Sequence, residues 1–231
     1  LTGISGSGKS RTVSKILAMY PQLLIHNTKD DPRLPLKQVV WIKVDYPSNR
    51  SMGGFCSRFL EQLGALVGED YKAKFGGGSV DDTITNIGVL ALLHFLGVLV
   101  VDEVQHEVGK KGKASDALLR HLISLSNELR MPIMFIGTPK ATRELRSRLA
   151  SARRLIGRDF KRYKKGDEDW VLLVSTIWDY QYTSNATETT EPMYDRLYEL
   201  TQGVPFFLIV LWVLTQRRLI LTGQRTGAPE A

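Results

Sequence analysis

The chain has 231 residues, and its 43% hydrophobic content excludes a disordered polypeptide, because enough apolar side chains are present to form a buried core. Its single cysteine, Cys56, excludes an internal disulfide and fits a reducing compartment. The formal net charge of +7 favours a polyanionic partner without proving one. The strongest apolar run, residues 204–214, is too short to span a bilayer, and no secretory signal is visible, so we expect a cytoplasmic protein with no membrane partner.

The start of the chain carries a phosphate-binding motif. Residues 3–10 read Gly-Ile-Ser-Gly-Ser-Gly-Lys-Ser, the G-x-x-x-x-G-K-[ST] pattern of a P-loop. The glycines let backbone N–H groups turn inward around an anion, Lys9 adds positive charge for the outer phosphates, and the Ser10 hydroxyl suits Mg²⁺. Residues 11–20 have helical spacing, so a helix N-terminus would point at the phosphates. The alternative is an ordinary glycine-rich turn, for which no such helix would be needed. The predicted nucleotide contacts are Ser5, Gly6, Ser7, Gly8, Lys9, Ser10 and Arg11.

Strands and helices alternate after this motif. Short β-branched or apolar runs predict strands at residues 39–44, 98–101, 133–136 and 170–176. Apolar periodicity predicts helices at residues 53–66, 83–95 and 116–129, and a strongly basic helical stretch at residues 140–157. Glycine-rich residues 71–79 are expected to form a mobile loop, and Lys/Gly-rich residues 106–115 an exposed one. The alternation indicates a central parallel sheet flanked by helices, with the functional site at the carboxyl edge of the strands.

The end of the chain is expected to be helical. Residues 183–190 are polar and without pattern, as in a linker, and helices are predicted at residues 192–200 and 204–219. We therefore expect an α/β core over residues 1–182, a small helical lid over residues 191–222 and a flexible tail over residues 223–231. Leu1 stands where the first strand should be ending, so we expect that strand to begin before it.

Two acidic residues follow the apolar strand at residues 98–101. A P-loop fold places its acidic pair here, where Asp102 would hold Mg²⁺ through water and Glu103 would orient and polarise the attacking water. A solvated acidic turn is the alternative. Thr138 ends the next strand, where it would position water or sense the γ-phosphate, cap the following helix, or do both.

The basic stretch offers arginines for catalysis, because phosphoryl transfer needs positive charge near the γ-phosphate. The candidates are Arg143, Arg146, Arg148, Arg153, Arg154 and Arg158. They lie past the sheet edge, so we expect them to reach the nucleotide of a neighbouring subunit, with Arg153 and Arg154 preferred. A solvated basic face or a nucleic-acid contact would also explain any one of them.

Several segments together resemble one family. They are the P-loop, Val-Val-Asp-Glu-Val-Gln at residues 100–105, Ile-Gly-Thr-Pro-Lys-Ala at residues 136–141, Ala-Arg-Arg at residues 152–154, Trp-Ile-Lys-Val-Asp-Tyr-Pro at residues 41–47 and Ile-Trp-Asp-Tyr-Gln-Tyr at residues 177–182. In these segments, which extend over nearly the whole chain, the sequence is similar to AAA+ ATPases of the TnsC/TniB group. Members of this group are the target-selection regulators of cut-and-paste transposons, and some of them are CRISPR-associated.

The resemblance implies a bacterial ATPase that uses ATP and Mg²⁺ and forms a ring or helical filament around double-stranded DNA. It also implies transposase subunits and a TniQ/TnsD-type targeting protein as partners. The chain departs from the pattern in the lid, where Gly203-Val204-Pro205 is followed by Phe206-Phe207 rather than by an arginine. Hydrolysis is therefore expected to be slow, with a switch-like role.

The resemblance also suggests two DNA-contacting segments, one after the second strand and one after the following helix. Their candidate phosphate contacts are Asn49, Arg50 and Ser51, followed by Lys72 and Lys74. Solvated loops are the alternative, and Lys110, Lys111 and Lys113 form a rival patch. The histidines have no companions at metal-ligand spacing, so no zinc site is expected.

Two other functions fit the same residues. A nucleotide-gated scaffold that coats DNA with negligible turnover would need ATP binding alone. A generic AAA+ protein remodeller would make no use of the positive charge.

Overall fold

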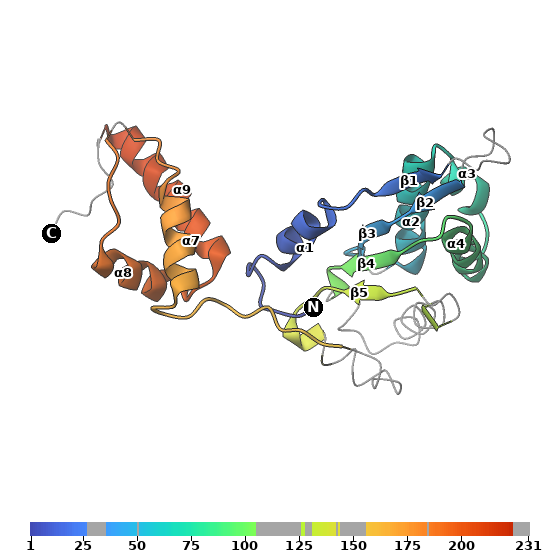
Figure 1. Cartoon of the computed structure of the whole chain (residues 1–231), viewed down its shortest axis with the longest axis horizontal. Coiled ribbons are helices and arrows are strands. Elements are labelled where there is room, and N and C mark those ends of the chain that lie inside the picture. Colours follow the sequence, from blue (N-terminus) through green and yellow to red (C-terminus); the bar gives the residue numbers. More distant parts are fainter. Residues whose placement is uncertain are drawn as a thin grey trace. The chain divides into compact units, whose positions relative to one another are not determined.

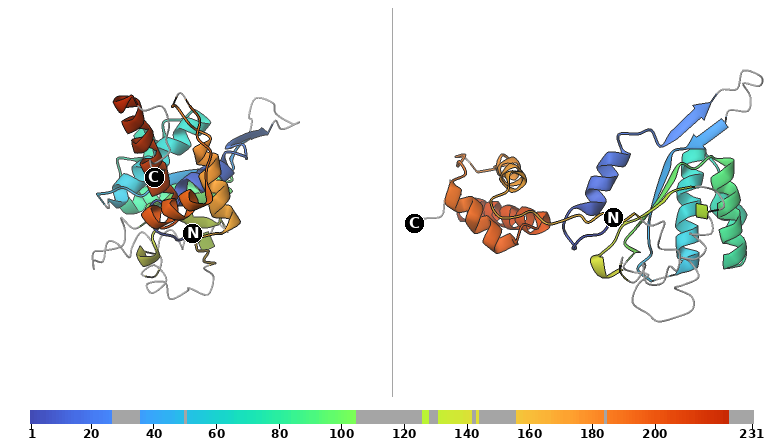
Figure 2. Two further views of the ribbon diagram at one scale, coloured as in Figure 1. Left: turned by 90° about the vertical axis from the view of Figure 1, so that its left-hand side faces the viewer. Right: turned by 60° about the horizontal axis from the view of Figure 1, so that its bottom comes forward.

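The computed structural model describes residues 1–26, 36–49, 51–104, 126–127, 131–141, 143, 156–183 and 185–223 (Figures 1 and 2). The chain divides into two compact units, which are described separately. The first contains Leu1–Thr2 and Lys9–Asp159, and the second contains Gly3–Gly8 and Phe160–Ala231.

A parallel sheet forms the centre of the first unit. Strand β4 (Val98–Asp102) lies between β3 (Trp41–Asp45) and β5 (Ile133–Phe135), and both neighbours run parallel to it. Beyond β5, Thr2 forms parallel bridges to Gly137 and to Asp159, so the residue that precedes the P-loop continues the sheet. The predicted parallel α/β core is confirmed, and its carboxyl edge carries Asp45 opposite Asp102.

Both faces of β4 are buried, which explains its uninterrupted apolar sequence. Leu99 and Val101 belong to the main hydrophobic cluster, whereas Val100 packs with Val13 and Ile136 on the opposite face. Successive side chains of a strand alternate between faces, so a continuous apolar run fits only a strand covered on both sides.

Among the described residues, helices α1, α2 and α4 cover this sheet, in agreement with the prediction. Helix α1 (Lys9–Leu17) supplies Val13 to one face, and α2 (Met52–Val67) and α4 (Val80–Leu93) fill the main cluster on the other. The side chains of α2 that are less than 2% exposed recur at helical spacing, and they are Phe55, Cys56, Phe59, Leu60, Leu63 and Val67. Burial of each large apolar side chain stabilises the fold by about 1.5–3 kcal/mol.

Two predictions for the first unit are wrong in part. The strand expected at residues 39–44 is divided, because β2 (Leu36–Val39) pairs antiparallel with β1 (Leu23–His26), and β3 begins only at Trp41. The expected loop at residues 71–79 begins with a short helix, α3 (Tyr71–Phe75). This helix is capped by Asp70, whose Oδ1 accepts from the Ala73 N–H at 2.9 Å, and is anchored by a 2.7 Å hydrogen bond between the Tyr71 hydroxyl and His94 Nε2.

The described residues of the second unit form helices α7 (Glu168–Trp178), α8 (Glu191–Thr201) and α9 (Pro205–Thr222). The predicted strand at residues 170–176 is wrong, because this segment lies within α7. Trp170, Val174 and Trp178 are buried at four-residue spacing. Helix α7 groups with α8 and α9, whereas the predicted α/β core extends to residue 182. Trp178 stacks on Trp212 of α9 with ring centroids 4.0 Å apart.

Within the described part of the chain, a single helix, α9, has the length and the apolar composition that would allow it to cross a membrane, and 22% of its residues are buried. A core helix of a soluble protein meets the same criterion. Leu208, Trp212 and Gln216 form its buried face, and the Gln216 side chain donates to the Tyr180 carbonyl at 2.9 Å and accepts from the Tyr182 N–H at 2.7 Å. These contacts make α9 a packed member of the helical unit.

Candidate nucleotide-binding site

The P-loop sequence folds as a tight turn that leads directly into α1. The Ser7 hydroxyl donates to the Ile4 carbonyl at 2.9 Å, and Gly6 and Gly8 have φ values of 77° and 95°, which side-chain-bearing residues rarely adopt. A Cβ added at Gly6 would lie 2.8 Å from Phe206 Cβ, and the Gly6 carbonyl accepts from the Phe206 N–H at 3.2 Å. The motif therefore requires glycine at both positions for backbone conformation, and at Gly6 for close approach as well.

Lys9 begins α1 and is only 8% exposed. Burial lowers the pKa of the Lys9 ammonium, and the negative charges of Glu103 and Asp102 oppose that effect. The first turn of α1 contains no acidic residue that would repel an anion. A buried cation at a helix N-terminus fits a phosphate, because a bound anion would offset the cost of its desolvation. Ser10 follows as a half-buried residue, and Arg11 is exposed.

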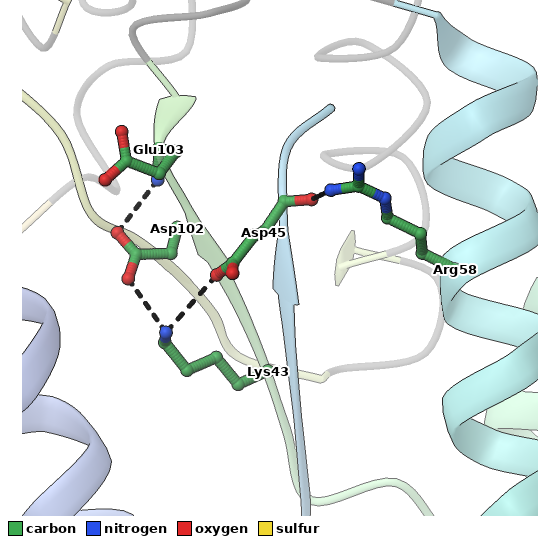
Figure 3. Close-up of polar contacts among 5 residues, drawn as sticks. All are labelled: Lys43, Asp45, Arg58, Asp102 and Glu103. Atoms are coloured by element: carbon green, nitrogen blue, oxygen red, sulfur yellow. Dashed lines mark hydrogen bonds and ion pairs between the residues drawn. The ribbon is translucent and has the colours of Figure 1, made fainter. Parts of the chain in front are cut away.

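The acidic pair occupies the carboxyl end of β4. Asp102 is 2% exposed, and its Oδ1 accepts from the Glu103 N–H at 2.8 Å (Figure 3). Glu103 has a left-handed backbone, with φ of 59°. A non-glycine residue pays about 1–3 kcal/mol for such a conformation, and strain of this kind clusters at functional sites. The buried carboxylate of Asp102 and the hydroxyl of Ser10 are the oxygen ligands that suit Mg²⁺.

Sequence reasoning missed Lys43, which joins this acidic edge from β3. Its Nζ lies 2.9 Å from Asp102 Oδ2 and 3.3 Å from Asp45 Oδ1 (Figure 3). Burial opposes the charged form of Lys43, but hydrogen bonds and attraction from Asp102 and Asp45 outweigh it, so the pKa of Lys43 is raised. The available signal was spacing: Lys43 and Asp45 stand two apart in a strand and therefore share a face.

Comparison with known proteins agrees with this geometry. The profile of the AAA domain family (AAA_22) matches residues 1–145, well over half of the chain and the whole stretch that carries the P-loop and the acidic pair. The chain belongs to this AAA family of P-loop ATPases. A search of curated proteins found no match.

Solved structures similar to this AAA domain share its fold at low sequence identity. The Walker-type ATPase paby2304 of Pyrococcus abyssi is 15% identical, with a TM-score of 0.54, and the match covers 96% of this chain and 62% of that one. The Aeropyrum pernix ORC1 protein in complex with DNA is 15% identical, with a TM-score of 0.52 and coverages of 100% and 56%. The FIGL-1 AAA domain is 13% identical, with a TM-score of 0.51 and coverages of 96% and 60%. The chain thus spans about three fifths of the length of these proteins.

Thr138 of the AAA domain follows β5, one residue after the bridge between Gly137 and Thr2. It is half-buried, and its Oγ1 accepts from the Ala141 N–H at 3.4 Å, the contact of a helix cap. The capping alternative is therefore present in the structure, and a role toward phosphate stays a prediction. Arg143 is exposed and Arg158 lies beside the bridge at Asp159, whereas Arg153 and Arg154, the preferred candidates for the catalytic arginine of a neighbouring subunit, lie outside the described residues.

Four of the five candidate DNA contacts already have partners within the chain. Lys72 pairs with Glu61, and Lys74 Nζ lies 2.6 Å from Glu69 Oε2. The Asn49 side chain accepts from the Ser51 N–H at 3.1 Å, and Ser51 Oγ accepts from the Gly54 N–H at 3.0 Å, which caps α2. Both lysines remain about half exposed. Arg50, Lys110, Lys111 and Lys113 lie outside the described residues.

Proposed function

We propose that this chain is an ATP-dependent DNA-binding regulator of transposition that assembles as a ring or filament on double-stranded target DNA and links target selection to transposase recruitment. The observation that carries the proposal is the acidic pair at the carboxyl end of β4, in a family defined by its P-loop. The narrower assignment to transposition rests on the resemblance of residues 136–141 and 177–182 to the TnsC/TniB group.

The residues divide the handling of ATP among themselves. The P-loop N–H groups and Lys9 bind the phosphates, and the strained backbone of Glu103 aims its carboxylate at the water that attacks the γ-phosphate. Thr138 positions that water, and Arg153 or Arg154 of a neighbouring copy stabilises the developing charge. Mg²⁺, held by Ser10 and Asp102, would supply charge neutralisation at the phosphate oxygens.

Positive charge supports the choice of DNA as the partner. The net charge is +7, and a protein of similar fold, ORC1, has been seen in complex with DNA. Asn49, Arg50, Ser51, Lys72 and Lys74 would touch phosphates without reading bases, so binding would be independent of sequence and sensitive to salt. The two lysines would exchange their carboxylate partners for phosphates at little cost, because surface ion pairs contribute little.

One observation favours a second function, the nucleotide-gated scaffold. In the lid, the residue after Pro205 is Phe206, whose N–H contacts the Gly6 carbonyl of the P-loop. Backbone contact of this kind supplies no charge to the phosphates, so ATP would govern assembly while hydrolysis stays slow.

The test is to mix the protein, with its natural termini, with a non-hydrolysable ATP analogue and duplex DNA, and to image and sediment the particles. We expect assemblies that need both ligands, that dissolve between about 50 and 200 mM salt because counterions compete for the phosphates, and that capture the transposase. Dispersed monomers in the presence of both ligands would refute the proposal. Assembly that ignores DNA and salt would instead indicate a remodeller of proteins.

A further inference from the structure

The acidic edge holds one cation to which the proposed handling of ATP gives no role. Lys43 Nζ stands between the carboxylates of Asp102 and Asp45, at 2.9 and 3.3 Å. The Asp102 side chain is 3% exposed and that of Asp45 is 60% exposed, so one partner is buried and the other is solvated. Figure 3 shows the ammonium between these two carboxylates, with the Glu103 carboxylate turned away from it.

The strand register builds this arrangement. Asp45 pairs with Asp102 across the parallel strands β3 and β4, and Lys43 shares the face of Asp45, while Ile42 and Val44 fill the main cluster on the other face. On the α2 side, Arg58 Nη1 donates to the Asp45 backbone carbonyl at 2.9 Å and fixes the end of β3. The position of Lys43 therefore follows from the sheet itself.

Electrostatics gives this cation a consequence. A buried carboxylate without a counter-charge is costly, and Lys43 supplies that charge to Asp102. A divalent cation at Asp102 would provide this counter-charge in place of Lys43, but it would be repelled by an ammonium still in contact with the same carboxylate. Asp45 offers Lys43 a second partner within reach, and because Asp45 is solvated, the exchange has little desolvation cost.

We propose that Lys43 is a positioning residue that sets the Mg²⁺ affinity of Asp102, as the counter-ion of that carboxylate in the metal-free chain and as the partner of Asp45 once Mg²⁺ is bound. The proposal deepens the proposed function and rests on its assignment of Asp102 as the metal-holding residue. It predicts that loss of the Lys43 charge raises the affinity for Mg²⁺ and that loss of the Asp45 charge lowers it.

The experiment measures thermal unfolding of the full chain with saturating ADP while Mg²⁺ is varied, and it reads the Mg²⁺ concentration that gives half of the stabilisation. Lys43→Met removes the competing charge, so the half-maximal concentration should fall about fivefold. Asp45→Asn removes the second partner and leaves Lys43 on Asp102, so that concentration should rise about threefold. Lys15→Met, an exposed lysine on α1, is the matched control and should leave it unchanged. Affinity for ADP measured in EDTA should be the same in all variants.

The outcomes are distinct. A purely structural role for Lys43 would lower the unfolding temperature at every Mg²⁺ concentration without moving the half-maximal value, and would overturn the proposal. If Lys43→Met does not fold, Asp45→Asn alone decides, because an unchanged or lowered half-maximal concentration contradicts the exchange. A wild-type chain that ADP does not stabilise, with or without Mg²⁺, refutes nucleotide binding itself and the proposal with it. If ADP·Mg²⁺ stabilises the wild-type chain but the half-maximal Mg²⁺ concentration is the same in the variants, only the role of Lys43 is refuted.

Discussion

Glu103 has an unusual backbone for a residue with a long side chain. Its left-handed conformation is held from both sides, because its own N–H donates to Asp102 Oδ1 at 2.8 Å and the Val104 N–H donates to the Ile136 carbonyl at 3.1 Å. These contacts tie the residue to β4 and to the end of β5. The backbone from which its carboxylate projects is therefore fixed by the sheet edge.

Glu103→Gln tests the role of this carboxylate. The amide keeps the size of the side chain but is a poor proton acceptor, so turnover of ATP should fall about 100-fold or more while nucleotide affinity is retained. Phosphate release and equilibrium binding of a non-hydrolysable analogue measure the two quantities. If hydrolysis drives disassembly, complexes on DNA should also live longer, and unchanged lifetimes would favour the scaffold.

Cys56 yields a prediction about chemical reactivity. It is 1% exposed in α2, and burial raises the pKa of its thiol to about 11. We expect Ellman's reagent at pH 8 to modify the folded chain at least about 100-fold more slowly than the unfolded chain, because access and thiolate are both lacking. The raised pKa also means that this site costs no stability below pH 9 and destabilises the fold as pH rises toward 11. Rapid modification of folded protein would contradict this placement.

Sequence identified the P-loop and the acidic pair because their residues are contiguous and their chemistry depends on fixed spacing. It did not identify Lys43, because the partner of Lys43 is on another strand and the contact exists only through the register of β3 with β4. Spacing alone places Lys43 and Asp45 on one face of β3, but no local pattern indicates that Asp102 lies beside them.

Among the secondary-structure elements, α7 shows where local reasoning fails. Its Trp-Val-Leu-Leu-Val sequence is short, apolar and partly β-branched, which fits a buried strand as well as a helix. What decides is tertiary packing: Trp170 and Val174 pack with Leu208 of α9, and the Trp170 indole N–H donates to the Tyr194 carbonyl at 3.2 Å. Helices α1, α2 and α4 were found correctly because their apolar spacing extends over several turns.

The cap of α2 separates stability from DNA contact at Ser51. Ser51→Ala removes the acceptor for the Gly54 N–H and should lower the free energy of unfolding by about 1 kcal/mol. Ser51→Asp keeps a good cap but places negative charge beside the phosphates, so it should be the more stable variant and bind duplex DNA more weakly. Denaturant titration and DNA binding measure the two effects. Equal DNA affinity of both variants would argue against a phosphate contact here.

Two glycines at helix ends form a matched pair in the second unit. Gly203 and Gly223 have φ values of 70° and 71°, but a Cβ at Gly203 would collide with the Tyr163 carbonyl oxygen, whereas none of the described atoms lies within 4 Å of one at Gly223. Gly223→Ala should cost about 1 kcal/mol for its backbone alone. Gly203→Ala should cost about 3 kcal/mol or more, because the backbone must also move. Far-UV circular dichroism in denaturant gives both values, and similar losses would contradict the close approach.

At the scale of the whole molecule, positive charge should appear as salt dependence. If Arg50 touches a phosphate, Arg50→Ala should weaken binding to every duplex sequence alike and reduce the slope of log affinity against log salt by about 0.9. Binding isotherms at several salt concentrations on two unrelated duplexes measure both effects. A loss confined to one sequence would show that Arg50 reads bases instead.

The tryptophans are unequally divided between the two units. Of the four in the chain, Trp170, Trp178 and Trp212 belong to the helical unit, and Trp41 belongs to the sheet unit. The stacking of Trp178 on Trp212 brings two indoles close enough for their electronic transitions to couple. The intrinsic ultraviolet emission and near-ultraviolet dichroism of the protein therefore report chiefly on the helical unit, so a response of that unit to nucleotide can be tested in solution without attaching any dye.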